Sequence, residues 1–459
     1  MMKKTIKIIQ RLYFIIILVC LFSSCSDDNS LTIIPQNSTA ILAIDGKEIL
    51  NNFQSGNISS IKSLLKIKKI EDCGIDFESN LYVFESVDGN IGFTANIADK
   101  NSFEEWVEKL STHSICTKPT KFGDLNFCVL KNMWLMGYSS NAMLIMGPIV
   151  ASQQAIMQRQ IQKYFKQDED NSIKASPLYE KLYGLDSPLS FVALASSLPQ
   201  KVVAPFIIGA PKEADPSQIV LAAEINKVDN NILQISGETF SFNNMINTYI
   251  KKAYSLYRPI QGRYLKSMPT TSMVGTFLNV RGKDFIKVLN NNKSLQVILA
   301  GINTAIDMNK IIESVDGDMG IVLYNTAENV MNLQLSAKLS NKNFLDDVEY
   351  WKKSCPKGGV IKKWGKDSYI YSDPSMTYYF GVTPDLQYYS GSNPNMACNS
   401  IKDIPSPLSE NIIDLVKGQR FCMIVNMKTV LYGNKVGALM PLLIKPIFGD
   451  ISTIIYTLK

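Results

Sequence analysis

Few side chains in this sequence could do chemistry. Among its 459 residues there is a single histidine, His113, so a serine or cysteine nucleophile has almost no choice of base. The visible acidic pairs are Glu104 with Glu105 and Asp346 with Asp347, and each lies at the start of a predicted helix, where acidic side chains are electrostatically favoured. We therefore interpret His113 as a solvated helix-end residue and the acidic pairs as a solvated face.

No motif for a cofactor or a metal ion occurs in the sequence. The phosphate-binding glycine-rich loop, the dinucleotide fingerprint and the nucleophile elbow are all missing. No two cysteines have the Cys-x-x-Cys spacing, and one histidine is too few for a histidine-rich zinc site. The sequence thus predicts no cofactor and no metal, and it does not reveal a specific activity.

Tyrosines distinguish the second half of the chain from the first. When the two halves are aligned by paired glycines, four aliphatic residues in neighbouring predicted strands, Val129, Leu135, Leu144 and Ile145, become tyrosines. Those tyrosines are Tyr371, Tyr379, Tyr388 and Tyr389, and the first three are the predicted ligand-binding residues. Because tyrosine combines an apolar ring with a hydroxyl group, the set predicts a stacking platform for a glycan or another envelope ligand. The alternative is structural, with tyrosines along a sheet or at the contact between the halves, since aromatic residues are enriched in strands.

The elements that must position these side chains form two related runs. Ser-Val-Asp-Gly occurs at residues 86–89 and again at residues 314–317, each time next to strand-like sequence. Asp-Gly favours a two-residue hairpin turn of type I′, which needs positive φ at both central positions. We therefore interpret Asp88 and Asp316 as turn residues in two copies of one unit.

Paired glycines extend the repeat. Gly137 and Gly147 have the same spacing as Gly381 and Gly391, and each pair brackets a predicted hairpin. Strands and helices are mixed without a regular parallel alternation, which predicts an α+β fold with mainly antiparallel sheets flanked by helices.

A chain of 459 residues is long enough for two or three domains. The second copy lacks the closing strand and the helix that follow in the first, so its last strand is either an edge or pairs with the first copy. The predicted division is a signal peptide at 1–24, an acylated cysteine with a polar tether at 25–33, a first α+β module at 34–240, a linker helix at 241–267 and a second α+β module at 268–459.

The N-terminus has the organisation of an export signal. Basic residues precede an apolar run at residues 12–22, which is too short to span a bilayer as a helix and has the length of a signal-peptide core. The run ends in Phe-Ser-Ser before Cys25, which resembles the lipobox of bacterial lipoproteins. That resemblance implies cleavage before Cys25 and acylation of its thiol. The alternative is an ordinary secretory signal followed by a chance cysteine.

Acidic residues directly follow this cysteine. Ser-Asp-Asp-Asn at residues 26–29 resembles the surface-export signal of Bacteroidetes lipoproteins, so we expect the outer face of the outer membrane, with its periplasmic face as the alternative. Much of the formal net charge of +6 belongs to the signal segment, so nothing favours a nucleic-acid partner. The cysteines beyond Cys25 permit disulfides in an oxidising compartment, but the sequence singles out no pairing.

The lipobox, the acidic tether, Ile34-Pro35 and the Asp-Gly-Lys at residues 45–47 together look like a family of large Bacteroidetes lipoproteins known only as a domain of unknown function. The resemblance covers nearly the whole mature chain and implies no activity. We expect an envelope protein, held to the membrane through lipid on Cys25, that acts by binding a glycan or an envelope protein or as a scaffold. The alternative is a surface hydrolase that acts on polysaccharide through paired carboxylates.

Overall fold

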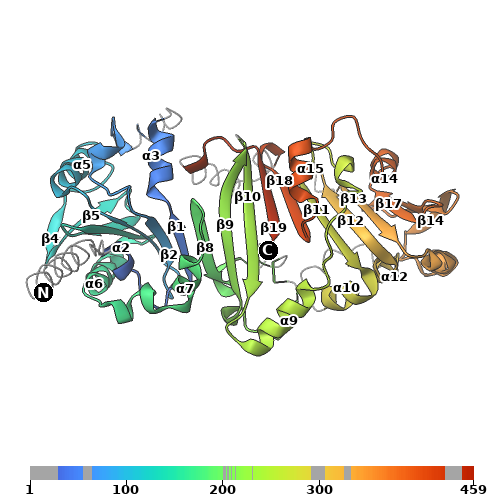
Figure 1. Cartoon of the computed structure of the whole chain (residues 1–459), viewed down its shortest axis with the longest axis horizontal. Coiled ribbons are helices and arrows are strands. Elements are labelled where there is room, and N and C mark those ends of the chain that lie inside the picture. The colour runs from blue at the N-terminus through green and yellow to red at the C-terminus, as the bar shows by residue number, and fades with distance from the viewer. Residues whose placement is uncertain are drawn as a thin grey trace, which may run out of the picture.

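The computed structural model describes residues 29–54, 62, 65–199, 203, 206–207, 209–211, 213–229, 231–290, 305–324, 332–429 and 447–459. The predicted signal peptide and Cys25 lie outside these ranges. Within them, nineteen strands form one sheet that runs along the length of the molecule (Figure 1). The fold is α+β with a mainly antiparallel sheet, as predicted.

Ten strands come from the first half of the chain. They are β1 (Ala40–Ile44), β2 (Leu81–Glu85), β3 (Ile91–Asn96), β4 (Thr120–Phe122), β5 (Leu125–Leu130), β6 (Trp134–Tyr138), β7 (Ala142–Gly147), β8 (Leu189–Leu194), β9 (Val220–Asp229) and β10 (Ile232–Phe240). Hydrogen-bonded pairing places them in the order β4-β5-β6-β7-β3-β2-β1-β8-β9-β10, and each pair is antiparallel.

The second half repeats this order. Its strands are β11 (Val274–Arg281), β12 (Val315–Leu323), β13 (Leu333–Leu339), β14 (Val360–Gly365), β15 (Ser368–Ser372), β16 (Thr377–Val382), β17 (Gln387–Gly391), β18 (Phe421–Asn426) and β19 (Thr453–Leu458). They pair in the order β14-β15-β16-β17-β13-β12-β11-β18-β19, again antiparallel throughout. Each strand therefore has the neighbours that its counterpart has in the first half.

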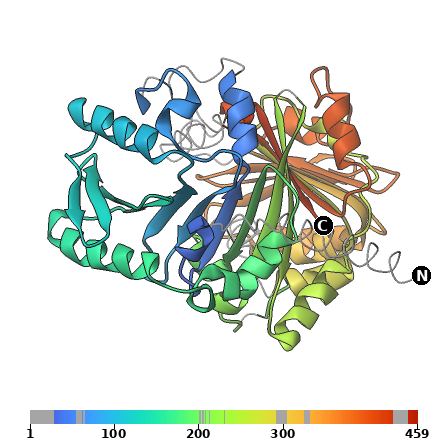
Figure 2. The ribbon, with the colours of Figure 1, turned by 60° about the vertical axis from the view of Figure 1, so that its left-hand side comes forward.

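Helices cover both faces of the sheet. They are α2 (Asn29–Thr32), α3 (Gly46–Gln54), α5 (Lys100–Thr112), α6 (Gln154–Phe165), α7 (Pro177–Tyr183), α9 (Asn244–Tyr254), α10 (Gly282–Leu289), α12 (Met308–Glu313), α13 (Val348–Ser354), α14 (Pro394–Asn399) and α15 (Glu410–Val416). In the first half, α5 and α6 lie on opposite sides of the outer strands (Figure 2). In the second half, α10, α12 and α13 contribute to the core on one face, while α15 contributes to the core on the other.

The halves join through the one parallel pair among the described strands. β10 runs beside β19, from Ile232 opposite Thr453 to Gly237 opposite Leu458. The last strand is therefore not an edge, which confirms the alternative that it pairs with the first half. Because β19 also pairs with β18, the backbone hydrogen bonds of the sheet are continuous across this seam.

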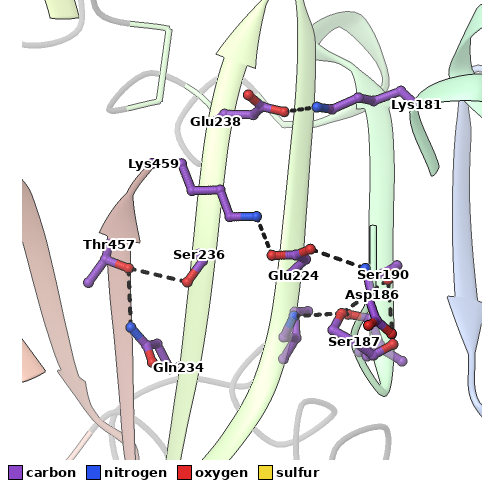
Figure 3. Close-up of polar contacts among 12 residues, drawn as sticks. Lys181, Asp186, Ser187, Ser190, Glu224, Gln234, Ser236, Glu238, Thr457 and Lys459 are labelled. Atoms are coloured by element: carbon purple, nitrogen blue, oxygen red, sulfur yellow. Dashed lines mark hydrogen bonds and ion pairs between the residues drawn. The ribbon is translucent and has the colours of Figure 1, made fainter. Parts of the chain in front are cut away.

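Polar side chains cross the seam on one face of the sheet (Figure 3). Thr457 of β19 lies 3.5 Å from Ser236 Oγ of β10 and accepts a hydrogen bond from Gln234 Nε2, also at 3.5 Å. Lys459 forms an ion pair with Glu224 of β9. Burial is the largest single influence on Glu224 and raises its pKa, but the hydrogen bonds from Lys459 and Asp186 N and the charges of Lys459 and Lys181 together outweigh it. The pKa of this carboxyl therefore lies below its usual range.

The hairpin predicted at residues 86–89 is present, but with a different turn. Between β2 and β3, Gly89 N donates to Ser86 O at 2.9 Å, and φ is positive at Gly89 but not at Asp88. This is the geometry of a type I turn followed by a left-handed glycine, and the predicted type I′ turn was wrong. Asp316 forms no hairpin turn, because it lies inside β12 opposite Arg281 of β11. Its interpretation as a turn residue was therefore also wrong.

Candidate functional site

The predicted tyrosine platform falls on the outer sheet of the second half, β14 to β17. Alternate residues of a strand point to opposite faces, so two adjacent tyrosines cannot share a surface. Tyr371 of β15 and Tyr388 of β17 point into the core, where they are 1% and 0% exposed. Tyr379 of β16 is half-buried on the opposite face. The three residues do not form a common surface, and the predicted platform is wrong.

The core tyrosines are held by rings and hydroxyl partners. Tyr388 packs edge-on against Phe344 with a centroid distance of 6.3 Å, and its hydroxyl lies 3.0 Å from that of Tyr378 on β16. Tyr371 OH donates to Asp373 Oδ2 at 2.6 Å. Burial and this carboxylate raise the pKa of Tyr371 to about 12. Hydrogen bonds from Ser375 and Tyr371 lower the pKa of Asp373 to about 2.

The register of the outer hairpin explains part of the error. The paired glycines bracket a hairpin in both halves, as predicted, but Gly137 lies opposite Leu144 whereas Gly381 lies opposite Tyr389. Equal spacing in sequence therefore hides a shift of one residue. Tyr389, and not Tyr388, occupies the place of Leu144 on the sheet.

A different aromatic surface exists on the other face of these strands. It consists of Trp364 on β14, Tyr379 on β16 and Tyr389 on β17, and we call it the aromatic face. The ring of Trp364 meets the ring of Tyr379 edge-on, with a centroid distance of 5.1 Å, and lies 6.3 Å from the ring of Tyr389. All three side chains are half-buried. The face is thus preorganised by mutual ring contacts and still meets solvent.

Gly381 makes room for this arrangement. A Cβ atom on Gly381 would lie 2.6 Å from the hydroxyl of Tyr389, so the ring rests directly over the backbone of β16. The hydroxyl group of Tyr389 is in turn fixed by Ser368 Oγ at 2.6 Å. A side chain at residue 381 would displace the tyrosine ring.

In the first half, a helix covers the corresponding face. There, Ile161 of α6 lies over Gly137, because a Cβ on that glycine would be 2.7 Å from Ile161 Cγ2. Met157 and Ile161 share a core with Leu135 and Leu144. In the described part of the second half, the short α14 follows β17 and packs against β13, β16 and β17 near Gly391, whereas Tyr389 and not a helix lies over Gly381. The aromatic side chains therefore stand where α6 lies in the first half.

Sequence reasoning did not choose Trp364 or Tyr389 as site residues, although Tyr389 was aligned with Ile145 and a signal for its face was present. Tyr378 with Tyr379 and Tyr388 with Tyr389 are adjacent pairs, so strand alternation must send one member of each pair to each face. Tyr379 is two residues before Gly381 on the same predicted strand, so the two must lie on the same face of the sheet. The register of β17 could not be counted in this way, because it depends on the length of the loop.

One member of each acidic pair lies beside a lysine. Glu104 lies 3.8 Å from Lys100 within α5, and Asp347 is paired with Lys310 at 2.7 Å. Helix α5 begins at Lys100 with Asp99 as its cap, so Glu104 and Glu105 lie beyond its first turn and not at its start as predicted. His113 is the C-cap residue of α5, with Nδ1 at 2.8 Å from the carbonyl oxygen of Lys109, consistent with its interpretation as a helix-end residue.

Most cysteines lie apart from one another, although the thiols of Cys116 and Cys128 are close enough to interact. Cys73, Cys116, Cys128, Cys355, Cys398 and Cys422 are free thiols. Cys422 is buried in an apolar core, and burial raises its pKa strongly. Among the described residues, no group of three or more His, Cys, Asp or Glu could hold a metal ion. None of the described helices combines the length and apolar character that a membrane crossing requires.

Comparison with known proteins gives a family but no activity. No curated protein matches this chain. Crystal form IV of TP0453 is similar with 10% identity and a TM-score of 0.31, covering 48% of this chain and 83% of that one. Crystal form III of TP0453 gives 10% identity and a TM-score of 0.25 over 81% and 96% of the two chains. The family model described as "Domain of unknown function (DUF4836)" matches residues 34–428, so the chain belongs to that family.

Proposed function

We propose that this protein is a lipid-anchored component of the cell envelope that binds a glycan through the aromatic face. The lipid would be carried by Cys25, and the sequence that follows it favours the outer face of the outer membrane. One observation carries the binding proposal. Trp364, Tyr379 and Tyr389 remain half-buried on a sheet face whose counterpart in the first half is closed by α6.

Aromatic rings suit this role for a physical reason. A sugar ring presents an apolar surface of C–H groups as well as hydroxyl groups, and an aromatic side chain offers an apolar body beside a polar tip. Tyr389 and Trp364 are held in place by Ser368 and by each other, so little side-chain entropy is lost when a ligand binds. Such a shallow site matches a binding or scaffold protein.

A glycan array with the mature chain tests this proposal. Trp364→Ala should lower affinity about fivefold or more for every glycan that the wild type retains, because a well-packed aromatic contact contributes about 1–3 kcal/mol. Phe122→Ala is the matched control, since Phe122 precedes a glycine on β4 as Trp364 does on β14 and is 45% exposed. Equal loss in both variants, or full retention in Trp364→Ala, would exclude the aromatic face as the binding surface.

The lipid anchor has a separate test. Cells that express the full chain are labelled with a fatty acid, and the protein is then recovered and fractionated. The wild type should carry label and remain with the outer membrane, whereas Cys25→Ala should lose both, and Cys398→Ala should behave as the wild type. Label that persists in Cys25→Ala would contradict lipidation at this residue, and resistance to added protease in intact cells would contradict surface exposure.

A further inference from the structure

A polar pocket lies beside the aromatic face. The segment at residues 258–263, which we call the strap, follows α9 and crosses β11 and β12. Arg258 N donates to Asn279 O at 2.8 Å, and Ile260 N donates to Gln419 O at 2.8 Å, so both ends of the strap's first half are fixed. A cavity of about 590 Å³ lies between the strap, these two strands and Lys338 of β13. This is the strap pocket.

Asp318 builds the wall of the strap pocket. Its side chain, 4% exposed, accepts hydrogen bonds from the backbone N–H groups of Gln261 at 3.0 Å and Arg263 at 2.9 Å. Asn279 Nδ2 adds a third at 2.9 Å. Asp316 is likewise engaged, with Oδ1 at 2.9 Å from Arg258 NH1. Both carboxylates are therefore committed to holding the strap on the sheet.

Two groups in the pocket keep unused hydrogen-bonding capacity. Among the described residues, the guanidinium of Arg263 has no ion-pair or hydrogen-bond partner, although its backbone is anchored by Asp318. Asn279 is 3% exposed, and its Nδ2 donates to Asp318 and to the carbonyl oxygen of Pro259. Its Oδ1 accepts no hydrogen bond from the described residues. With the acids engaged, the pocket offers an unpaired cation and a buried acceptor, which suit an anion that also carries hydroxyl groups.

The corresponding pocket in the first half has the opposite character. Ala43 and Asn279 each lie three residues before the glycine that begins the following helix, and Ala43 pairs with Tyr82 as Asn279 pairs with Asp318. That pocket, of about 250 Å³, is lined by tyrosines and by Asp45 and Asp186, with no arginine or lysine. The cationic character therefore belongs to the second half, where the aromatic face also lies.

The strap pocket and the aromatic face share one side of the sheet. In the ladder of β13 with β17, Ser336 lies opposite Tyr389 and Lys338 lies opposite Gln387. Lys338 is thus the diagonal neighbour of Tyr389, at roughly 7–8 Å between backbones for such pairs. Because Lys338 lines the pocket, a ligand chain that stacks on Tyr389 can continue towards Arg263.

We infer that the ligand is an acidic glycan, with the carboxylate of a uronic-acid-type sugar held by Arg263 and a neighbouring sugar stacked on the aromatic face. This inference rests on the proposed glycan binding and adds the charge of the ligand. Arg263 offers a bidentate contact to a planar carboxylate. Lys338 lines the pocket edge, where its Nζ also donates to the carbonyl oxygen of Asp385.

Titration calorimetry of the mature chain with an oligogalacturonide and with its methyl ester tests the inference, because esterification removes the negative charges and adds only one methyl group to each carboxyl. The acid should bind at least tenfold more tightly than the ester, and added salt should reduce the difference. Arg263→Gln should lower affinity for the acid to that for the ester and leave the ester unchanged. Arg159→Gln, in α6, is the matched control and should have no effect.

The outcomes separate this inference from the proposed function. Equal affinity for acid and ester, or wild-type affinity for the acid in Arg263→Gln, overturns the acidic ligand. If Trp364→Ala at the same time lowers the affinity for the methyl ester, the proposed glycan binding by the aromatic face is retained and only the acidic ligand is rejected. Binding of neither probe, together with retention of a neutral glycan that depends on Trp364, also overturns the acidic ligand only.

Discussion

The buried tyrosines of the second half predict a directional effect on stability. Ser390 Oγ donates to the carbonyl oxygen of Leu335 at 3.2 Å, so it can accept the proton of Tyr378, whose hydroxyl lies 2.8 Å away. A hydroxyl group has one proton, so Tyr388 must donate to Tyr378 across 3.0 Å. The chain of hydrogen bonds therefore runs from Tyr388 through Tyr378 and Ser390 to a backbone carbonyl.

The direction of this chain sets the expected costs. Tyr388→Phe removes the first donor and leaves no polar group without an essential partner, so it should reduce the free energy of unfolding by about 1 kcal/mol. Tyr378→Phe removes the middle member and strands the buried hydroxyl of Tyr388, so it should cost about 2–3 kcal/mol. The double variant should cost less than the sum of the two, because no hydroxyl is then stranded.

Guanidinium unfolding followed by tryptophan fluorescence measures these differences, since Trp351 belongs to the same core. Tyr379→Phe is the control on the opposite, half-buried face and should change the free energy of unfolding by less than about 0.5 kcal/mol. A larger loss in Tyr388→Phe than in Tyr378→Phe would reverse the deduced direction. Losses below about 0.3 kcal/mol in both variants would refute the hydroxyl chain itself.

Two further predictions concern stability. Gly282→Ala should lower the free energy of unfolding by about 3 kcal/mol or more, because the new Cβ would lie 1.7 Å from the carbonyl oxygen of Ile312. Gly184→Ala is the control and should be close to neutral, since its nearest contact is at 3.6 Å. Equal effects of the two substitutions in thermal or chemical unfolding would contradict this packing. Asp373→Asn should cost less than about 1 kcal/mol at pH 7, because the site is solvent-screened. The folded pKa of Asp373 is lowered to about 2, so its contribution is complete above pH ~4 and disappears as pH falls towards 2; a difference from the wild type that grows on acidification would refute this assignment.

The mixed, mainly antiparallel fold could be predicted because it depends on local patterns. Gly46 and Gly282 each precede a lysine and an acidic residue in the sequence, and both lie against a backbone carbonyl. A Cβ would lie 2.4 Å from Phe77 O in one case and 1.7 Å from Ile312 O in the other. The shared strand order supports two related modules, although the duplication and the module boundaries stay predictions.

The pairing register of the strands, and the sheet face on which each side chain lies, could not be predicted from the sequence. The repeated Ser-Val-Asp-Gly at residues 314–317 lies at the start of β12, whereas its match at residues 86–89 follows β2, so the two motifs are not equivalent. Gly317 is needed there for another reason, because φ is +146° and a Cβ would lie 2.9 Å from Lys338. The strap pocket escaped prediction because Arg263, Asn279 and Lys338 are brought together only by tertiary pairing.

The position of β19 has a consequence for how the chain matures. It follows every other described strand in sequence, yet it sits in the middle of the sheet between β10 and β18. During synthesis from the N-terminus, β10 and β18 each keep one edge of unpaired backbone groups until β19 has been made. Two exposed strand edges of this kind invite pairing with other chains. The sheet becomes continuous only when β19 inserts between β10 and β18. Before that insertion, the two unpaired strand edges make aggregation most favourable.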